Sequence, residues 1–283
     1  MTAQSPLVTA AWLADHLDDP DVVILDASWH MPATGRDPAK EYADGHIPGA
    51  RFFDIDGVSD HASDLPHMLA SPQEFATAVR RLGVEPTSTV VIYDTVGIMS
   101  APRAWWNFRQ MGHDKVFVLD GGLKAWLAEG HPVETGWREA PHGEFKAHPR
   151  PALVRDIDQV RAVLASGAEQ VVDARPAARF TGETPEPRAG LRSGHMPGAR
   201  NVPFGALVTT DGTLAAPGEI KAAFEAAGVD LTRPITTSCG SGITACVLAL
   251  GLARIGRDDV AVYDGSWTEW GGRQDTPVAS GAG

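Results

Sequence analysis

Four blocks of sequence occur twice in this chain, in the same order and with offsets between 144 and 149 residues. The matched pairs are Val22–Asp26 with Gln170–Asp173, Tyr42–Arg51 with Leu191–Arg200, Val90–Asp94 with Ile235–Cys239, and Val116–Trp126 with Val260–Trp270. Chance rarely produces several such matches in one order, whereas an internal duplication produces them directly. The chain is therefore predicted to contain two copies of one structural unit, and its 283 residues suit two domains of about 150 residues.

Each copy alternates short runs of β-branched residues with longer helix-like segments such as residues 72–82. This alternation predicts an α/β fold in which each domain has a mostly parallel sheet flanked by helices on both faces. The strands are nearly continuous apolar runs, as expected for strands that are covered on both faces. The predicted boundaries are 1–134 for the first domain, 135–152 for a linker rich in Pro, Gly and His, and 153–283 for the second domain.

Composition excludes several classes of function. A net charge of −12, from 24 basic and 36 acidic residues, argues against a nucleic-acid partner, because such proteins need a basic face. No apolar run approaches the ~18 residues of a membrane span, and the N-terminus lacks the basic start of a signal peptide. The two cysteines are not spaced for a disulfide framework, and no metal-ligand spacing occurs. We therefore expect a cytoplasmic protein with no membrane partner, no metal and no cofactor.

Cys239 follows a predicted strand and opens the run Cys239-Gly-Ser-Gly-Ile-Thr-Ala245, which leads into an apolar, helix-like segment. A strand that turns through such a loop into a helix points several backbone N–H groups at one place. Thiolate is the form of cysteine that this place favours, so Cys239 is a candidate nucleophile. The alternative is a structural cysteine packed between strand and helix, the usual fate of a free cysteine. These residues alone leave both interpretations open.

With the duplication added, the sequence resembles the two-domain rhodanese family of sulfurtransferases from about Leu7 to Val278. His46-Ile-Pro-Gly-Ala50 is similar to the N-terminal signature of that family, and Tyr263-Asp-Gly-Ser-Trp-Thr-Glu-Trp270 to the C-terminal one. The resemblance implies that both domains are rhodanese-like. It also implies that the first is catalytically inactive and contributes to a cleft, whereas the second carries the nucleophile. Asp94 stands where the second domain has Cys239.

The loop after the cysteine narrows the expected substrate. Members that act on thiosulfate carry Arg and Lys directly after the cysteine, whereas Gly240-Ser241-Gly242 resembles the members that act on 3-mercaptopyruvate. The resemblance implies that Cys239 takes sulfur from 3-mercaptopyruvate as a persulfide, releases pyruvate, and passes the sulfur to an acceptor thiol, thioredoxin or cyanide. Gly240, Gly242, Ile243 and Thr244 are then expected to line the substrate site.

The resemblance also supplies the other site residues. Ser241 is expected to relay protons together with His67 and Asp56 of the first domain, which requires an active site between the domains. The simpler alternatives are a loop histidine, a carboxylate that caps a turn, and a serine that merely suits a tight loop. His46 and His195 belong to the signatures and are expected to tie loops together.

A substrate carboxylate needs a cation, preferably a bidentate one. The segment 175–200 contains five arginines, and the resemblance favours Arg188, followed by Arg179. Some members carry a second substrate arginine where this chain has Pro197, so Arg192 or Arg179 is expected to take its place. A solvated basic face is the alternative for any one of these arginines.

Three other functions are compatible with parts of this sequence. A cysteine phosphatase needs an arginine six residues after the cysteine, where this chain has Ala245. A thiosulfate sulfurtransferase is the nearest alternative. A catalytically silent binding module is the third, since Asp94 shows that one copy has no cysteine. The tryptophans Trp105, Trp106, Trp267 and Trp270 are expected in the core rather than in a ligand site.

Overall fold

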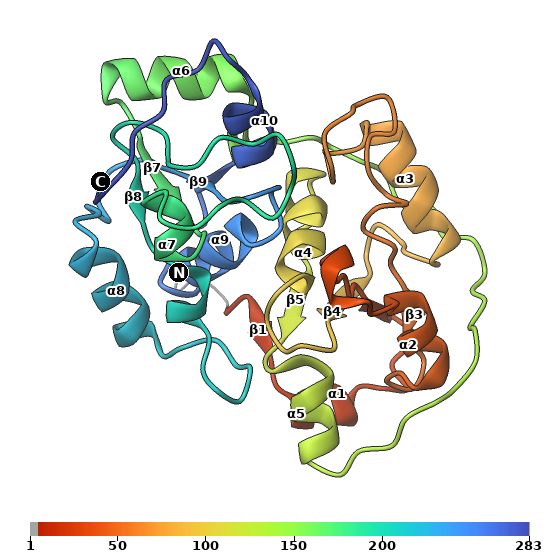
Figure 1. Cartoon of the computed structure of the whole chain (residues 1–283). Coiled ribbons are helices and arrows are strands. Elements are labelled where there is room, and N and C mark those ends of the chain that lie inside the picture. Colours follow the sequence, from red (N-terminus) through yellow and green to blue (C-terminus); the bar gives the residue numbers. More distant parts are fainter. Residues whose placement is uncertain (1–4, 283) are drawn as a thin grey trace.

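The computed structural model of the chain describes residues 5–282, so the predicted domain ends at residues 1 and 283 lie outside the described part. It contains two sheets, each of five parallel strands (Figure 1). The first has the order β1 (Leu7–Val8), β5 (Val116–Leu119), β4 (Thr89–Tyr93), β2 (Val22–Asp26), β3 (Arg51–Phe52). The second has the order β6 (Val154–Arg155), β10 (Ala261–Tyr263), β9 (Ile235–Ser238), β7 (Gln170–Asp173), β8 (Arg200–Asn201). The identical strand orders confirm the predicted duplication and fold class.

Helices cover both faces of each sheet. In the first domain α1 (Ala10–Asp15) and α5 (Gly122–Ala128) pack on one face, α3 (Pro72–Arg81) and α4 (Ala101–Gln110) pack on the other, and α2 (Pro38–Asp44) precedes β3. In the second domain α6 (Ile157–Ser166), α7 (Ala177–Phe180) and α10 (Ser266–Gly272) cover one face, and α8 (Pro217–Ala226) and α9 (Ala245–Arg254) the other. Short 3₁₀ turns occur at Pro32–Thr34, Pro151–Leu153 and Phe204–Leu207.

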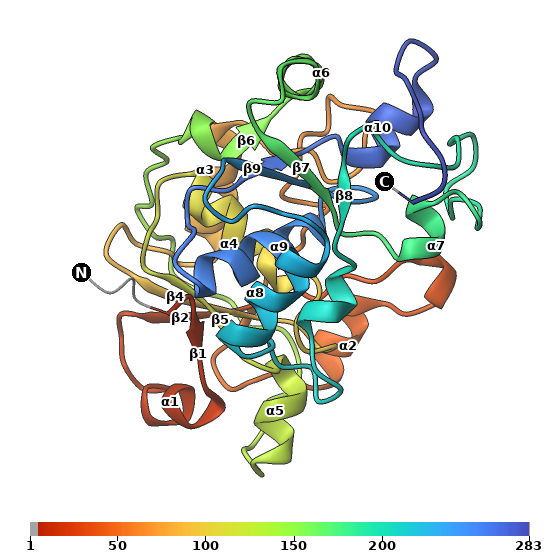
Figure 2. The ribbon, with the colours of Figure 1, turned by 90° about the vertical axis from the view of Figure 1, so that its left-hand side faces the viewer.

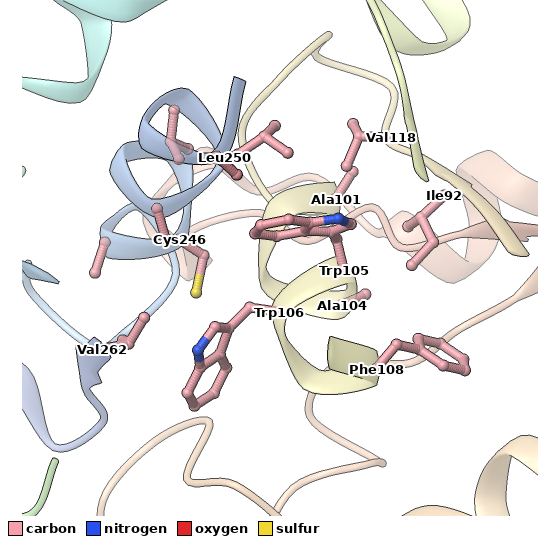
Figure 3. Packing of buried hydrophobic residues seen from close by; sticks show 14 of the residues in the cluster. Ile92, Ala101, Ala104, Trp105, Trp106, Phe108, Val118, Cys246, Leu250 and Val262 are labelled. Carbon is pink, nitrogen blue, oxygen red and sulfur yellow. The ribbon is translucent and has the colours of Figure 1, made fainter. Parts of the chain in front are cut away.

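The two domains share one apolar core. Helices α4 and α9 lie side by side between the sheets in both views (Figures 1 and 2). Figure 3 shows Cys246 and Leu250 on the α9 side of this contact, with Trp105 and Trp106 on the α4 side. All four side chains are buried, which confirms the expected structural role of the two tryptophans. Because this apolar surface would otherwise face water, the hydrophobic effect fixes the domains against each other.

The predicted linker does not hang free between the domains. After α5 the chain runs along the outside of the first domain (Figure 1) and forms backbone hydrogen bonds with it at Gly136, Gly143 and His148. Phe145 is fully buried against Phe75 and other aromatic rings of the first domain. The absence of an apolar period in this segment gave no indication that one of its residues would enter the core.

Candidate active site

Cys239 lies at the C-terminal end of β9, where the loop to α9 begins, and only 1% of its surface is exposed. Its backbone N–H donates to Ser266 Oγ at 3.1 Å, and its carbonyl oxygen accepts from the Trp267 N–H at 2.9 Å. The next carbonyl, of Gly240, accepts from both the N–H and the hydroxyl of Thr268. The start of α10 therefore holds the cysteine loop by its backbone, which is what the C-terminal sequence motif does in the fold.

The N–H groups of this loop have no acceptor. Within the part of the chain that the structure describes, the backbone N–H groups of residues 240–245 donate no hydrogen bond. Gly242 has a φ of +80°, a conformation that side chains other than glycine rarely adopt. Unpaired N–H groups at the start of a helix form a site for an anion, so the loop has the chemistry to hold a thiolate or a persulfide.

The corresponding loop of the first domain shows the same site with an anion in it. Asp94 follows β4 as Cys239 follows β9, and its carboxylate accepts five backbone N–H hydrogen bonds from its own loop. The donors are Val96, Gly97, Met99, Ser100 and Ala101, at 2.8 to 3.0 Å. A carboxylate that belongs to the chain thus satisfies the N–H groups that the second domain leaves open.

Asp56 and His67, which the family resemblance assigns to one proton relay, lie beside each other. The distance between His67 Nδ1 and Asp56 Oδ1 is 2.6 Å, and the indole of Trp29 donates to the other carboxylate oxygen at 3.0 Å. Burial would raise the pKa of Asp56, but the hydrogen bonds from His67 and Trp29 and the charge of Arg188 outweigh it and lower that pKa. The Nε2 atom of His67 is buried and has no partner among the described residues. Ser241 is also buried, yet no hydrogen bond joins it to His67 or Asp56 in the described part of the chain.

His67 has a strained backbone. Its φ is +62°, and its counterpart in the second domain is Gly212, with a φ of +85°. A bulky residue in this left-handed region costs on the order of 1 kcal/mol or more relative to glycine. This backbone conformation puts the His67 imidazole at a position where the second domain has Gly212 and therefore no side chain.

Two arginines approach the cysteine loop. A Cβ atom placed on Gly240 would lie 3.2 Å from Arg179 Nη2 and 3.9 Å from Arg188 Nη1. Arg179 is held by Glu186, whereas Arg188 makes no hydrogen bond or ion pair within the described residues. Burial lowers the pKa of Arg188, and the nearby Cys239 opposes that effect. Among the described residues, Arg188 is therefore a cation without a partner beside the cysteine loop.

The other arginines of this segment have structural contacts. Arg175 is buried in ion pairs with Asp173 and Glu186. The Arg192 guanidinium donates four hydrogen bonds, to Trp270 and Gly271 at the end of α10 and to Thr276 after it. These contacts leave Arg179, not Arg192, as the candidate for the second substrate arginine missing at Pro197.

Sequence reasoning missed two charged residues behind the loop, Arg103 on α4 and Asp264 after β10. They form an ion pair between the domains, with Arg103 Nη1 2.7 Å from Asp264 Oδ1. Asp264 was visible as part of a signature, but nothing in the sequence pointed to Arg103, because a single arginine in an apolar helix usually faces water.

The family model of the Rhodanese-like domain matches residues 9–129 and 156–273, which are most of the two structural units. The chain belongs to the rhodanese family.

Several full-length relatives of this rhodanese carry curated names. It is 48% identical over 272 residues to the 3-mercaptopyruvate sulfurtransferase of Escherichia coli, covering 96% of each chain. It is 45% identical to the human 3-mercaptopyruvate sulfurtransferase, covering 93% of this chain and 91% of the human one. It is also 44% identical to the thiosulfate sulfurtransferase of Bos taurus, covering 98% and 96%. The crystal structure of SseA from Escherichia coli matches with a TM-score of 0.86 at 46% identity, covering 93% of this chain and 99% of that one.

The signature histidines of this rhodanese tie loops together, as predicted. His46 Nδ1 lies 2.9 Å from the Tyr42 carbonyl oxygen, and its backbone pairs with Glu134. His195 lies in the same way against the Phe180 carbonyl oxygen and pairs with Ala279.

Cys246, the second cysteine, lies inside α9 rather than in the loop. It is fully buried in α9, its thiol donates to the Gly242 carbonyl oxygen at 3.2 Å, and burial raises its pKa well above the usual value. Both cysteines are free. Among residues 5–282, no three His, Cys, Asp or Glu side chains are grouped to hold a metal ion, and no helix has the length and hydropathy to cross a membrane.

Proposed function

We propose that this rhodanese is a sulfurtransferase that moves sulfur from 3-mercaptopyruvate to a thiol or cyanide by way of a persulfide on Cys239. The observation that carries the proposal is the juxtaposition of a cysteine, a loop of unpaired N–H groups and the unpaired guanidinium of Arg188. The curated names of the relatives from Escherichia coli and human support it.

In the first step, the Cys239 thiolate attacks the sulfur of 3-mercaptopyruvate. A new S–S bond forms, the C–S bond of the substrate breaks, and its electron pair leaves with the carbon as the enolate of pyruvate. The enolate takes up a proton and departs as pyruvate. The persulfide that remains is an anion, and the N–H groups of residues 240–245 are placed to stabilise it.

In the second step, an acceptor thiolate or cyanide attacks the outer sulfur of the persulfide. The S–S bond breaks, its electron pair returns to Cys239 as thiolate, and the acceptor leaves as a persulfide or as thiocyanate. No external oxidant or reductant is required. Thioredoxin is proposed as one protein acceptor, since it would carry the sulfur away on a thiol and could release it by forming its own disulfide.

Ser241, His67 and Asp56 are proposed to handle the protons. Asp56 fixes the Nδ1 side of the His67 ring, which leaves Nε2 for a substrate or for Ser241. In the structure the Ser241 hydroxyl does not yet bond with that nitrogen, so the proposed relay forms when the substrate enters the loop.

Arg188 and Arg179 are proposed to bind the carboxylate of the substrate. Arg188 has no other partner among residues 5–282, and Arg179 is oriented by Glu186, so the two guanidinium groups form one cationic side of the loop. Gly240, Gly242, Ile243 and Thr244 would contribute their N–H groups to the sulfur instead.

Thiosulfate is the alternative donor, and it is supported by the relative from Bos taurus. The loop of this chain has no cation at Gly240 or Ser241, where a dianionic donor would require one, and this favours 3-mercaptopyruvate. The deciding measurement is kcat/KM for both donors with cyanide as the common acceptor, with Cys239→Ser as the inactive reference. A higher value for thiosulfate, or pyruvate release by Cys239→Ser, would contradict the proposal.

We also propose that the protein works in a reducing compartment such as the cytoplasm. Two free cysteines and no disulfide within residues 5–282 support this proposal. The relatives do not decide the compartment, because one from Arabidopsis thaliana, 43% identical over 302 residues, carries the description mitochondrial.

A further inference from the structure

The contacts between the two domains occur in matched pairs. Each domain has a loop that leads into a helix, with the sequence Leu69-Ala-Ser-Pro72 in the first domain and Leu214-Ala-Ala-Pro217 in the second. The Leu69 N–H donates to Asp264 Oδ2 of the second domain, and the Leu214 N–H donates to Asp120 Oδ1 of the first, both at 2.7 Å. In each domain, the loop before this helix (the covering loop) therefore packs over the loop that begins at Asp94 or Cys239 in the opposite domain (the cysteine-type loop). Asp120 and Asp264, which accept the two hydrogen bonds, occupy equivalent positions in the two domains.

The two sites differ at the point where the covering loop meets the cysteine-type loop. Over the Asp94 loop, Gly212 lies directly against Gly97, since a Cβ atom on Gly97 would fall 2.6 Å from the Gly212 carbonyl oxygen. Over the Cys239 loop, the matching residues are His67 and Gly242. Here a Cβ atom on Gly242 would meet Arg103 Nη1 at 2.7 Å, and no atom of His67 is among its nearest neighbours. A guanidinium thus stands beside the active loop where the inactive site has a contact between two backbones.

Arg103 touches both halves of the active site. Its Nη2 donates to the His67 carbonyl oxygen, and its Nη1 donates to the Gly242 carbonyl oxygen at 3.4 Å. The same Nη1 pairs with Asp264, and the guanidinium lies 4.7 Å from the Trp106 ring centroid. Burial would lower the pKa of Arg103, but its interactions with Asp264, Cys246 and Cys239 together outweigh this effect and raise the pKa, so the side chain stays charged.

The second domain has no equivalent of this residue. Arg103 is the third residue of α4, and the third residue of α9 is Val247, whose side chain cannot donate a hydrogen bond. At the inactive site the carboxylate of Asp120 pairs instead with Arg254, the last residue of α9, at 3.4 Å and with partial exposure. Arg254 is not bonded to Gly97 or Gly212 in the described part of the chain.

We propose that Arg103, held by Asp264, is a positioning residue that sets the His67 imidazole against the Cys239 loop. Arg103 donates to the carbonyl oxygen of His67 and to that of Gly242, and both residues have a positive φ. It therefore fixes the backbone that carries the His67 imidazole and the backbone of the loop whose N–H groups face the sulfur. This inference rests on the proposed function, since it gives His67 a role in transfer to or from Cys239. Arg103 is too deeply buried to bind substrate itself.

The test compares Arg103→Lys with Arg254→Lys, the matched variant at the inactive site. Lysine keeps the charge for Asp264 but cannot donate to two carbonyl groups from one planar fork. We expect Arg103→Lys to lower kcat for 3-mercaptopyruvate by at least about tenfold, because even a small displacement of the His67 imidazole should slow the reaction. The KM should change less than about threefold, because Arg188 and Arg179 are untouched. Arg254→Lys should leave both constants near wild type.

A double-mutant cycle with His67→Asn separates positioning from general stability. Asparagine tolerates the left-handed backbone, so His67→Asn removes the imidazole with little change of fold. If Arg103 acts through His67, then Arg103→Lys lowers kcat in the wild-type background and has almost no further effect in His67→Asn. Asp264→Asn is the second variant, should Arg103→Lys fail to fold.

Three results would overturn the inference: an unchanged kcat in folded Arg103→Lys, an additive double mutant, or an equal loss in Arg254→Lys. Failure of the proposed function gives a different pattern, because wild type would then prefer thiosulfate or Cys239→Ser would still release pyruvate. If thiosulfate is the donor, the same double-mutant cycle is measured with thiosulfate and still tests whether Arg103 acts through His67.

Discussion

The Asp94 loop and the Cys239 loop have the same strand before them, the same kind of helix after them and the same cover from the opposite domain. They differ in what occupies their centre. Asp94 turns its own carboxylate inward and accepts five N–H groups, while the loop after Cys239 leaves its N–H groups without acceptors. The first loop contains its own anion, whereas the loop after Cys239 can accept one.

Under the proposed function, this difference explains how the first domain can keep the fold without a nucleophile. A buried N–H group without a partner costs about 1–3 kcal/mol, so an inactive loop needs a permanent anion more than it needs a nucleophile. Asp94 supplies one and closes the loop. The active copy keeps its polar groups unsatisfied at Cys239, which is an expected cost of a functional site.

The largest expected effect comes from making the active loop resemble the inactive one. Cys239→Asp should remove sulfur transfer by at least about a thousandfold, as loss of a nucleophile does. Its melting temperature should equal or exceed that of wild type, because the new carboxylate can accept the loop N–H groups. Activity assays and thermal unfolding check this, with Cys239→Ser as the control that lacks the charge. A melting temperature below that of Cys239→Ser would mean that the two loops are not equivalent anion sites.

The reverse change should damage the inactive copy. Asp94→Ala leaves five inward N–H groups without an acceptor, so we expect a loss of about 3 kcal/mol or more in unfolding free energy. Urea unfolding measures the loss, and Asp94→Asn, which keeps one good acceptor, should lose less. Equal stability of Asp94→Ala and wild type would show that water satisfies this loop.

Two arginines of the second domain, Arg188 and Arg192, are expected to have different roles, one in substrate binding and the other in stability. Arg188→Ala should raise KM for 3-mercaptopyruvate about 10- to 100-fold with a smaller effect on kcat, because it removes a charge-assisted contact to the carboxylate. Arg192→Ala should leave KM unchanged and lower the melting temperature, because Arg192 bonds only with the chain itself. Steady-state kinetics and thermal unfolding test the pair, and an unchanged KM in Arg188→Ala would assign the carboxylate to Arg179.

The smallest expected effect is a difference in the pH dependence of stability between Asp26, at the end of β2, and Asp173, at the end of β7. Burial raises the pKa of Asp26 to about 6, whereas Asp173 pairs with Arg175 at 2.7 Å. Since the folded pKa of Asp26 exceeds the unfolded value of 3.8, stability falls as pH rises from about 4 to about 6. Asp26→Asn should therefore be more stable than wild type at pH 8 and no more stable below pH 4.

Asp173→Asn should lose stability at pH 8 instead, because it leaves the buried Arg175 with one anion fewer. Unfolding free energies of both variants at the two pH values provide the measurement. Parallel behaviour of the two variants would mean that the two carboxylates have the same environment.

The sequence predicted what depends on local pattern and on repetition. The two copies, their mostly parallel sheets and the loop at Cys239 followed from the repeated blocks and from the alternation of strand-like and helix-like segments. The structural role of His46 and His195 and the grouping of Asp56 with His67 followed from the family resemblance, whereas the order of the strands was not predicted. The sequence could not predict Arg103, since its partners lie 36 to 161 positions away and only tertiary packing joins them. The strain at His67 was equally hidden, because a backbone angle imposed by neighbours leaves no mark on composition.

The paired contacts of Leu69 with Asp264 and of Leu214 with Asp120 give the domain boundary the form of the interface in a symmetric dimer. In a dimer of identical subunits, any substitution would appear on both sides of that interface at once. Joining the two units in one chain removes this constraint. One side could acquire a strained histidine and a buried arginine while the other kept two glycines in contact. The segment that connects the domains therefore does more than hold them together: it allows two halves of one interface to evolve separately.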